Sequence, residues 1–300
     1  RLNESLKTSG KQQIQIEKID QRLESEDILE MVNAGLIPMT VVDSHLARLW
    51  IQVFDNLKVR SDLAVSTGGQ IAWAFRKDSP KLRAEINDFV AQHREGTLFG
   101  NMIFKKYLRE TKYVVNAASE QEMKKFQSTI VYFKKYAAQY DFDWLMVAAQ
   151  SYQESKIDQS VKSQVGAIGV MQVLPTTAAD RNVNVPNIDQ VENNVHAGVK
   201  YMRFMMDQYF KDAKMDRLNK GLFALASYNA GPAKVASMRK EAQESGLDPN
   251  LWFNNVELIA AKRIGRETVQ YVSNIYKYYV AYKLAVEQIA KKKALKSQRG

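Results

Sequence analysis

A single carboxylic acid, Glu154, stands at the expected end of a helix and shortly before a glycine-containing loop. The preceding residues recur at the spacing of one helix face, which predicts a buried side made of Trp144, Val147, Ala148, Ser151 and Tyr152. Gly166 and Gly169 then allow the backbone to approach a ligand or another element closely. A carboxyl group on a rigid helix beside such a loop is suited to general acid catalysis. Glutamates at helix ends are more commonly solvated charges, so these residues alone leave both roles open.

Four short motifs follow one another in the second half of the sequence, and together they are far more specific than any one of them. They are Glu154-Ser155, then Gly166-Ala167-Ile168-Gly169-Val170-Met171-Gln172 with Pro175-Thr176-Thr177-Ala178, then Ser227-Tyr228-Asn229-Ala230-Gly231, and finally Glu267-Thr268-Val269-Gln270-Tyr271-Val272. The set resembles the soluble-lytic-transglycosylase domain, which has a goose-lysozyme-like fold. Val170 and Ser227 depart mildly from it, since the family often has Leu and Ala at these positions. The resemblance implies an all-α, lysozyme-like catalytic domain.

The resemblance also implies a chemistry for Glu154. In this family one glutamate protonates the glycosidic oxygen between N-acetylmuramic acid and N-acetylglucosamine in peptidoglycan. The same glutamate then acts as a base on the muramyl C6 hydroxyl, which closes on C1 and leaves a 1,6-anhydro end without the attack of water. Such an acid must remain protonated near neutral pH, and burial against apolar neighbours such as Val147 and Met171 raises the pKa of a carboxyl group. We therefore expect the pKa of Glu154 to be raised.

Two alternatives to a lytic transglycosylase remain open at this point. A goose-type hydrolytic lysozyme shares the fold and the glutamate, and a catalytically silent protein would bind the wall or sense muropeptides. Glycoside hydrolysis usually takes two carboxyl groups, but the matched motifs offer only Glu154 on the cleft helix. Asp158 matches no family position, and we expect Glu267 to orient the substrate or Tyr271 and not to act as a nucleophile.

The resemblance assigns substrate contacts to eight further residues: Ser155, Ser163, Met171, Gln172, Tyr228, Asn229, Glu267 and Tyr271. Ser163 matches a family serine that contacts the muramyl group, and Gln172 matches a cleft glutamine whose amide offers both a donor and an acceptor. Ser155 has an equally good structural interpretation, in which it orients the turn after the acid. Asn229 has one as well, because it precedes the turn at Gly231.

Composition places the chain among ordinary globular proteins, with 45% hydrophobic and 25% charged residues. No apolar run approaches the roughly 20 residues that a membrane-spanning helix needs. The sequence has no cysteine, which excludes disulfides, thiolate catalysis and cysteine-based zinc sites. His45, His93 and His196 lack the spacing of a metal site. We therefore expect neither a metal nor another cofactor.

The formal net charge is +10, and most of it lies in residues 113–300, where 26 Lys and Arg stand against 18 Asp and Glu. A basic domain is attracted to an anionic polymer such as a cell wall or a nucleic acid, although a basic surface alone does not require such a partner. No nucleic-acid-binding motif accompanies the charge. The family resemblance implies peptidoglycan as the partner, and no nucleic acid is expected.

Residues 1–112 alternate strand-like and helix-like segments, which favours a mostly parallel α/β sheet. Strands are expected at residues 13–17, 37–43, 63–65 and 70–75, and helices at 25–32, at 45–54 and from Pro80 onward. After a polar connector, residues 109–120, the pattern is helical, with helices at 123–137, 144–155, 197–209, 222–228 and 269–289. The predicted fold class is α+β in two domains: a partial α/β domain (1–112) and an all-α domain (113–300).

The N-terminal region resembles, more loosely, the later part of a type 2 periplasmic solute-binding module. The similarity rests on residues 25–35, the strand that ends at Asp43, and residues 75–82, and it covers about the second half of such a module. We expect Asp78 to cap a helix and not to bind a ligand. The order of the two regions resembles membrane-bound lytic murein transglycosylases of the F type. It implies a periplasmic location and a regulatory N-terminal domain, and it leaves open a small-molecule or muropeptide effector and an association with the outer membrane.

Overall fold

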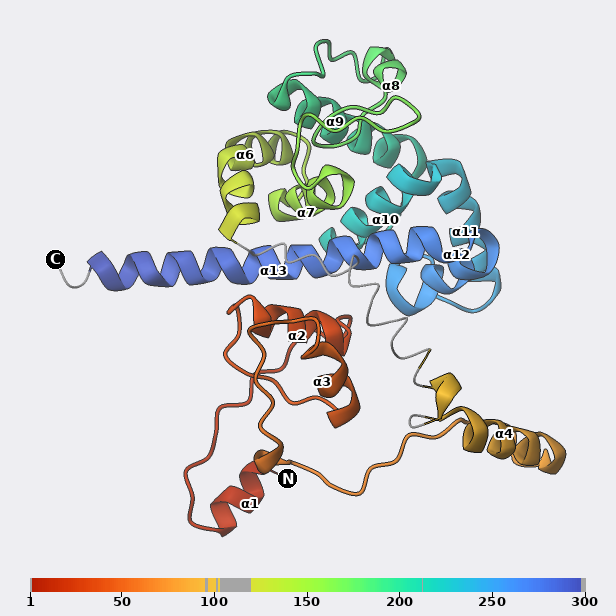
Figure 1. Cartoon of the computed structure of the whole chain (residues 1–300). Coiled ribbons are helices and arrows are strands. Elements are labelled where there is room, and N and C mark those ends of the chain that lie inside the picture. The colour runs from red at the N-terminus through yellow and green to blue at the C-terminus, as the bar shows by residue number, and fades with distance from the viewer. Residues whose placement is uncertain (1, 95–96, 101, 103–119, 212, 298–300) are drawn as a thin grey trace. The chain divides into compact units, whose positions relative to one another are not determined.

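The computed structural model describes residues 2–94, 97–100, 102, 120–211 and 213–297. Contacts within the chain divide it into two units, Arg1–Asn116 and Ala117–Gly300. The sequence placed the boundary after residue 112, and the predicted connector 109–120 lies, apart from Glu120, outside the described residues. Within the described ranges the chain forms helices and no strand, apart from isolated β-bridges of Ile168 to Lys162 and Val173 (Figure 1).

The named elements of the N-terminal unit are α1 (Leu2–Thr8), α2 (Ser25–Asn33), α3 (Ser44–Trp50), the short 3-10 turn η1 (Ser61–Leu63) and α4 (Pro80–His93), and residues 98–100 are helical as well. Helix α2 begins with a capping box, in which Glu24 and Asp27 each bond the other's backbone, and Gly35 follows its end with a φ of 70°. The expectation that Asp78 caps α4 is wrong, because Ser79 occupies the capping position.

The strands predicted for the N-terminal unit are wrong. Residues 13–17, 37–43 and 70–75 are irregular, and residue 63 belongs to η1. A segment with alternating side chains forms a strand only where its backbone N–H and C=O groups hydrogen-bond to a neighbouring strand and a core covers its apolar face. Here the apolar members of the alternation, Val41, Ile71 and Trp73 among them, are exposed. The described residues therefore do not support an α/β solute-binding-like domain.

The C-terminal unit is helical, as predicted. Its elements are α6 (Glu120–Gln139), α7 (Trp144–Ser155), α8 (Pro175–Ala179), α9 (Val191–Tyr209), α10 (Arg217–Ala230), α11 (Pro232–Glu244), the kinked π-helical turn η3 (Trp252–Val256), α12 (Glu257–Ile264) and α13 (Arg266–Ser297). The five helices expected from periodicity are present, and all but α7 are longer than predicted. Helices α11 and α12 were missed. Proline in the first turn starts α8 and α11, where the missing N–H costs nothing.

Helix α7 packs against α6 and α13 (Figure 1). It begins at Asp143, whose carboxylate accepts a hydrogen bond from the Leu145 N–H at 2.9 Å. The predicted buried face is confirmed at Val147, Ala148 and Tyr152, which are fully buried. Burial extends further than one face, because every residue from 145 to 152 is buried.

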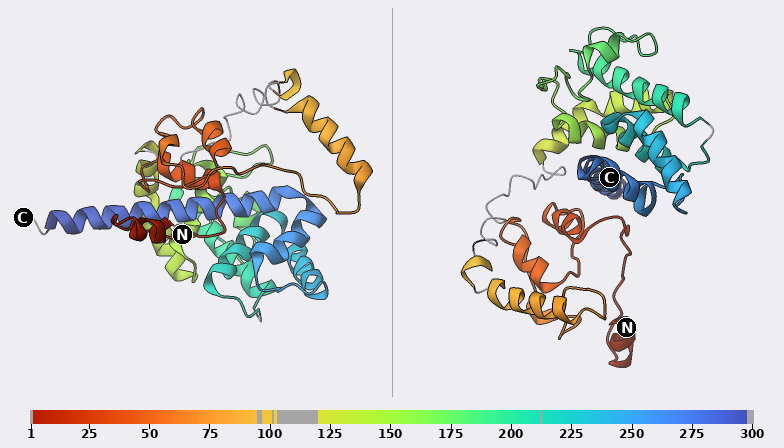
Figure 2. Two further views of the ribbon diagram at one scale, coloured as in Figure 1. Left: turned by 90° about the horizontal axis from the view of Figure 1, so that it is seen from below. Right: turned by 90° about the vertical axis from the view of Figure 1, so that its right-hand side faces the viewer.

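Helix α13 runs along the whole unit and lies on one side of its other helices (Figure 2). One face of this helix belongs to the core, where Val272, Tyr276 and Tyr282 are buried. Tyr279 donates a hydrogen bond to Asp143 at 3.1 Å, which ties α13 to the start of α7. Two helices that carry functional motifs are thereby fixed against each other.

Among the described helices, none combines the length and the apolar character that crossing a bilayer requires.

Candidate active site

Glu154 lies in the last turn of α7, directly before a sharp change of chain direction. Lys156 and Ile157 follow with φ angles of 59° and 55°, a region that non-glycine residues enter only at a cost in free energy. The Lys156 N–H donates to the Tyr152 carbonyl at 2.9 Å, and the Ile157 N–H donates to the Ser151 carbonyl at 3.3 Å. Backbone strain of this kind persists only where the surrounding structure holds it, and it is concentrated at functional sites.

Tyr271 of α13 donates a hydrogen bond from its hydroxyl to Oε1 of Glu154 at 2.5 Å. Glu154 is half-buried, and burial raises its pKa from 4.5 to about 7, against an opposing effect of the Tyr271 hydrogen bond. Burial, and then the proximity of Glu154, raises the pKa of Tyr271 well above its usual value, so this hydroxyl stays a donor. The expected rise in the pKa of Glu154 is thus present, and such a group can both release and accept a proton near pH 7.

Asn194, a fully buried residue of α9, holds the loop that follows α7. Its Oδ1 accepts a hydrogen bond from the Met171 N–H at 2.8 Å, and its Nδ2 donates to the carbonyls of Ile168 at 2.7 Å and Ile188 at 2.9 Å. One side chain therefore satisfies three backbone groups in the interior. The sequence analysis missed this residue, because no spacing relates it to the motifs.

The two glycines of the loop serve different purposes. Gly169 has a φ of 76°, and a Cβ there would collide with the side-chain amides of Gln159 and Asn194. Gln159 in turn accepts a hydrogen bond from the Val170 N–H at 3.2 Å. Gly169 thus approaches another element and not a ligand. Gly166, with a φ of 86°, has open space around its Cα, so its backbone conformation alone favours glycine.

The two predicted serines engage the backbone of the loop. Ser155 is buried, donates to the Val170 carbonyl at 3.0 Å and accepts from the Asp158 N–H at 3.1 Å. Its hydroxyl therefore orients the turn, as the structural interpretation held. Ser163 is half-buried and accepts a hydrogen bond from the Ala167 N–H at 2.9 Å, which leaves its own hydrogen for another acceptor.

Met171 and Gln172, at the end of the loop, differ in how far their side chains are buried. The Met171 side chain is fully buried, and its sulfur packs against Gly198 of α9, so it faces the core and not a ligand. A substrate contact through this side chain is therefore not supported. Gln172 is half-buried, and its Nε2 donates to the carbonyls of Gly169 at 2.9 Å and Val161 at 3.1 Å. Only the Gln172 Oε1 remains for a further partner.

Hydrogen bonds join all four motifs. The Tyr228 hydroxyl of the third motif donates to the Met171 carbonyl of the second at 2.8 Å. The Thr268 hydroxyl of the fourth motif donates to Oδ1 of the exposed Asn229 in the third at 2.7 Å. The bond between Tyr271 and Glu154 joins the fourth to the first. Residues that are scattered in the sequence therefore form one constellation around the acid.

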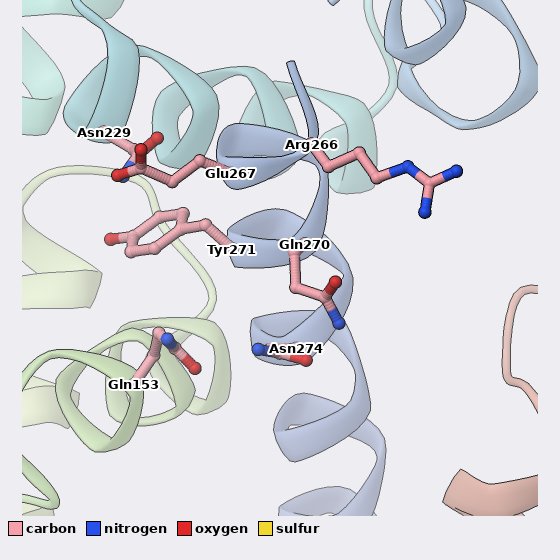
Figure 3. A pocket seen from close by; sticks show the side chains of 7 residues that line it. All are labelled: Gln153, Asn229, Arg266, Glu267, Gln270, Tyr271 and Asn274. Atoms are coloured by element: carbon pink, nitrogen blue, oxygen red, sulfur yellow. The ribbon is translucent and has the colours of Figure 1, made fainter. Parts of the chain in front are cut away.

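A pocket opens beside Tyr271 at the start of α13, where Figure 3 shows the Asn229 and Glu267 side chains next to each other and Arg266 directed away. Its lining residues are Gln153, Asn229, Arg266, Glu267, Gln270, Tyr271 and Asn274. The sequence analysis had identified Asn229, Glu267 and Tyr271 but not the three further amides. A signal existed for two of them, because Gln270 and Asn274 lie three and seven residues after Glu267 on the same helix.

The raised pKa of Glu154 predicts that Glu154→Gln gains stability relative to wild type as the pH rises. The folded protein holds this proton up to about pH 7, whereas the ordinary value is 4.5. The contribution of Glu154 is therefore most favourable below pH 4.5 and is lost as the pH rises through 7. We expect the difference in unfolding free energy between variant and wild type to change by roughly 2–3 kcal/mol between these limits. Urea unfolding at pH 5 and pH 8 measures it, with the exposed Glu287→Gln as a control that shows no such change.

Comparison with known proteins supports the motif assignment. Residues 131–251 match the family described as "Transglycosylase SLT domain". A "Membrane-bound lytic murein transglycosylase F" of Desulfosudis oleivorans is 30% identical over 276 residues, which cover 85% of this chain and 58% of that protein. A protein of the same name from Pseudomonas fluorescens Pf0-1 is 30% identical over 287 residues, which cover 89% of this chain and 57% of that protein. The chain thus spans less than two thirds of the length of these relatives.

Among solved structures, an inactive mutant of the lytic transglycosylase Slt from Pseudomonas aeruginosa matches with a TM-score of 0.45 and 22% identity, over 66% of this chain and 30% of that one. A likeness at this level carries no further conclusion. The sequence matches are more informative. They cover at least 85% of the chain, which is more than the C-terminal unit contains, so the similarity extends into the N-terminal unit. The family recognised from the four motifs is confirmed: residues 131–251 are a transglycosylase SLT domain, within a chain related beyond that domain to membrane-bound lytic murein transglycosylases F.

Proposed function

We propose that the protein is a peptidoglycan lytic transglycosylase. It cleaves the β-1,4 bond between N-acetylmuramic acid and N-acetylglucosamine and leaves 1,6-anhydro ends. The observation that carries the proposal is the carboxyl group of Glu154, which is half-buried, bonded to Tyr271 and shifted to a pKa of about 7. At that pKa the group exists in both protonation states near neutrality, as a residue must that first donates and then accepts a proton.

The other carboxylates near Glu154 support a mechanism with one acid. Hydrogen bonds from Ser160 lower the pKa of Asp158, which is engaged within its own loop. Glu267 is exposed at the pocket. A retaining or inverting hydrolase needs a second carboxylate as nucleophile or base, whereas a transglycosylase uses the C6 hydroxyl of its own substrate. The names of the related proteins, which include "lytic murein transglycosylase", agree with the second route.

We assign the remaining roles as part of the same proposal. Asn229, Glu267, Tyr228 and Ser163 contact the glycan, the Gln172 Oε1 accepts from a sugar amide, and Ser155 positions the acid by fixing the turn. The basic C-terminal domain acts on the wall in the periplasm, and the N-terminal unit regulates or positions it. The effector of that unit and an association with the outer membrane stay predictions.

Product analysis tests the proposal. Purified peptidoglycan is digested with the full chain, and the soluble fragments are identified by mass spectrometry. We expect anhydro-muropeptides, which are lighter by one water than fragments with reducing ends. Reducing ends would instead assign a hydrolytic lysozyme, and binding to the wall without any product would assign a silent wall-binding protein.

Tyr271→Phe is expected to move the alkaline limb of the pH–rate profile upward by about one pH unit. The Tyr271 hydrogen bond lowers the pKa of Glu154, so its loss lets Glu154 stay protonated to higher pH. We also expect the maximal rate to fall about tenfold, because the carboxylate formed in the reaction loses a donor. The measurement is kcat for anhydro-end release between pH 4 and pH 9. Tyr279 lies on α13 like Tyr271, and Tyr279→Phe loses only a hydrogen bond to Asp143 at the start of α7, so it should leave the limb in place.

A further inference from the structure

Gln150 lies one helical turn before Glu154 on α7 and is fully buried. Its Nε2 donates a long hydrogen bond to the Tyr271 hydroxyl oxygen at 3.4 Å. Its Oε1 has no hydrogen-bond partner within the described part of the chain. The sequence analysis assigned this residue no role, and it lines no part of the pocket beside Tyr271.

Packing alone does not account for an amide at this position. The neighbours Val147, Ala148 and Ala149 are fully buried apolar residues, and an apolar side chain of similar size would fill the same space. A buried amide with an unpaired oxygen costs free energy relative to such a side chain. The position therefore serves the partner that the amide has among the described residues, the Tyr271 hydroxyl.

The direction of the hydrogen bonds shows what this contact does. The Tyr271 hydroxyl has a single hydrogen, which it donates to Oε1 of Glu154. The Nε2 of Gln150 can only donate, so it binds the Tyr271 oxygen without competing for that hydrogen. The opposite orientation of the amide would present Oε1, which would attract the Tyr271 hydrogen away from Glu154. Consecutive bonds of one direction also polarise and strengthen one another.

We propose that Gln150 is a positioning residue that keeps Tyr271 as a hydrogen-bond donor to Oε1 of Glu154, so that Oε2 carries the acid proton to the substrate. The Gln150 side-chain amide is hydrogen-bonded to Tyr271 and not to the Glu154 carboxyl group, so it acts through Tyr271. The titratable groups that face Glu154 are Tyr271 from α13 and Tyr228 from α10. The inference rests on the proposed function only in taking Glu154 as the acid.

The test is a double-mutant cycle on the pKa of Glu154, measured without substrate. Its carboxyl carbon is followed by ¹³C NMR between pH 4 and pH 10 and identified by its loss in Glu154→Gln. The proteins are wild type, Gln150→Met, Tyr271→Phe and the double variant. We expect Gln150→Met to raise the pKa by about 0.5 unit, because Tyr271 becomes a weaker donor. In the Tyr271→Phe background, Gln150→Met should change the pKa of Glu154 by less than about 0.1 unit, because the hydroxyl that links Gln150 to Glu154 is already absent.

Two outcomes would overturn the inference: an unchanged pKa in Gln150→Met, or an equal shift that persists in the Tyr271→Phe background. Ser151→Ala is the matched control, since Ser151 is equally buried on α7 but bonds the Val147 carbonyl and not Tyr271. It should leave the pKa unchanged. If the double variant does not fold, the uncharged Gln150→Leu decides, because it also removes the donor to Tyr271 and should raise the pKa of Glu154 as Gln150→Met does, whereas an unchanged pKa would overturn the inference.

Activity separates this inference from the proposed function. If the protein is a lytic transglycosylase, Gln150→Met should lower kcat for anhydro-end release about three- to tenfold with little change in KM, and its alkaline limb should follow the measured pKa. If wild type forms no anhydro ends, the proposed function fails, and the NMR cycle still decides the role of Gln150.

Discussion

Glu154→Gln is expected to lower the rate of anhydro-muropeptide release by a factor of about 10²–10⁴, which is the usual contribution of a general acid–base group. Glutamine keeps the size of the side chain and can still accept the hydrogen bond that Tyr271 gives to Glu154. It cannot donate a proton to the glycosidic oxygen or take one from the C6 hydroxyl. Both halves of the proposed reaction therefore fail while the fold remains. Initial rates on purified peptidoglycan, read by mass spectrometry of the released ends, measure the effect.

The companion variant Glu267→Gln distinguishes a mechanism that uses one carboxyl group from a mechanism that uses two. Glu267 is exposed at the pocket, and as a residue that orients the substrate it should lose less than about tenfold in rate when its charge is removed. A loss as large as that of Glu154→Gln would contradict the single-acid mechanism and indicate a hydrolase with two carboxylates. Retained activity in Glu154→Gln would contradict the assignment of the acid itself.

Asn194→Ala is expected to cost roughly 3 kcal/mol or more of stability and to abolish most activity. The variant leaves the Met171 N–H and the carbonyls of Ile168 and Ile188 without their partner, and each unsatisfied buried group costs about 1–3 kcal/mol. The freed segment includes the Met171 carbonyl, which accepts the hydrogen bond of Tyr228. Loss of the Asn194 side chain is therefore expected to disturb the candidate active site as well as the core.

Urea unfolding and initial rates on peptidoglycan measure both consequences of Asn194→Ala. Asn193→Ala is the control, because its amide makes only two long, exposed hydrogen bonds, to Asn187 and Gln190. It should change stability by less than about 0.5 kcal/mol. Equal stability of Asn194→Ala and Asn193→Ala would show that the loop holds its position without this anchor.

The sequence predicted the C-terminal unit well because two local signals agreed there. Apolar spacing gave the helices α6, α7, α9, α10 and α13, and the motifs placed Glu154 at the end of one and Tyr271 near the start of another. Helix α11 was not predicted because its exposed face interrupts the apolar pattern. Only Val235, Met238 and Ala242 of this helix are buried. The N-terminal strands failed for the opposite reason. Their alternation is real, but pairing depends on a partner strand that a single segment's pattern cannot reveal.

The residues that support the site were harder to predict than the acid. Asn194 and Gln159 act through backbone groups far along the chain, and Gln150 acts through Tyr271 of another helix. None of these contacts follows a helical or strand period, so they emerge only when the helices are packed. Met171 shows the converse error: its place in a motif indicated the substrate, whereas its side chain belongs to the core.

The position of Tyr271 on α13 affects how the C-terminal unit can be isolated. The family match ends at residue 251, before α13 begins at Arg266. A protein cut at that match would keep Glu154 but would lose Tyr271 and the helix that covers one side of α7. The smallest recombinant piece that retains the assembled acid must therefore run from α6 through α13. A fragment designed on the family boundary alone would lack the hydrogen bond from Tyr271 to Glu154.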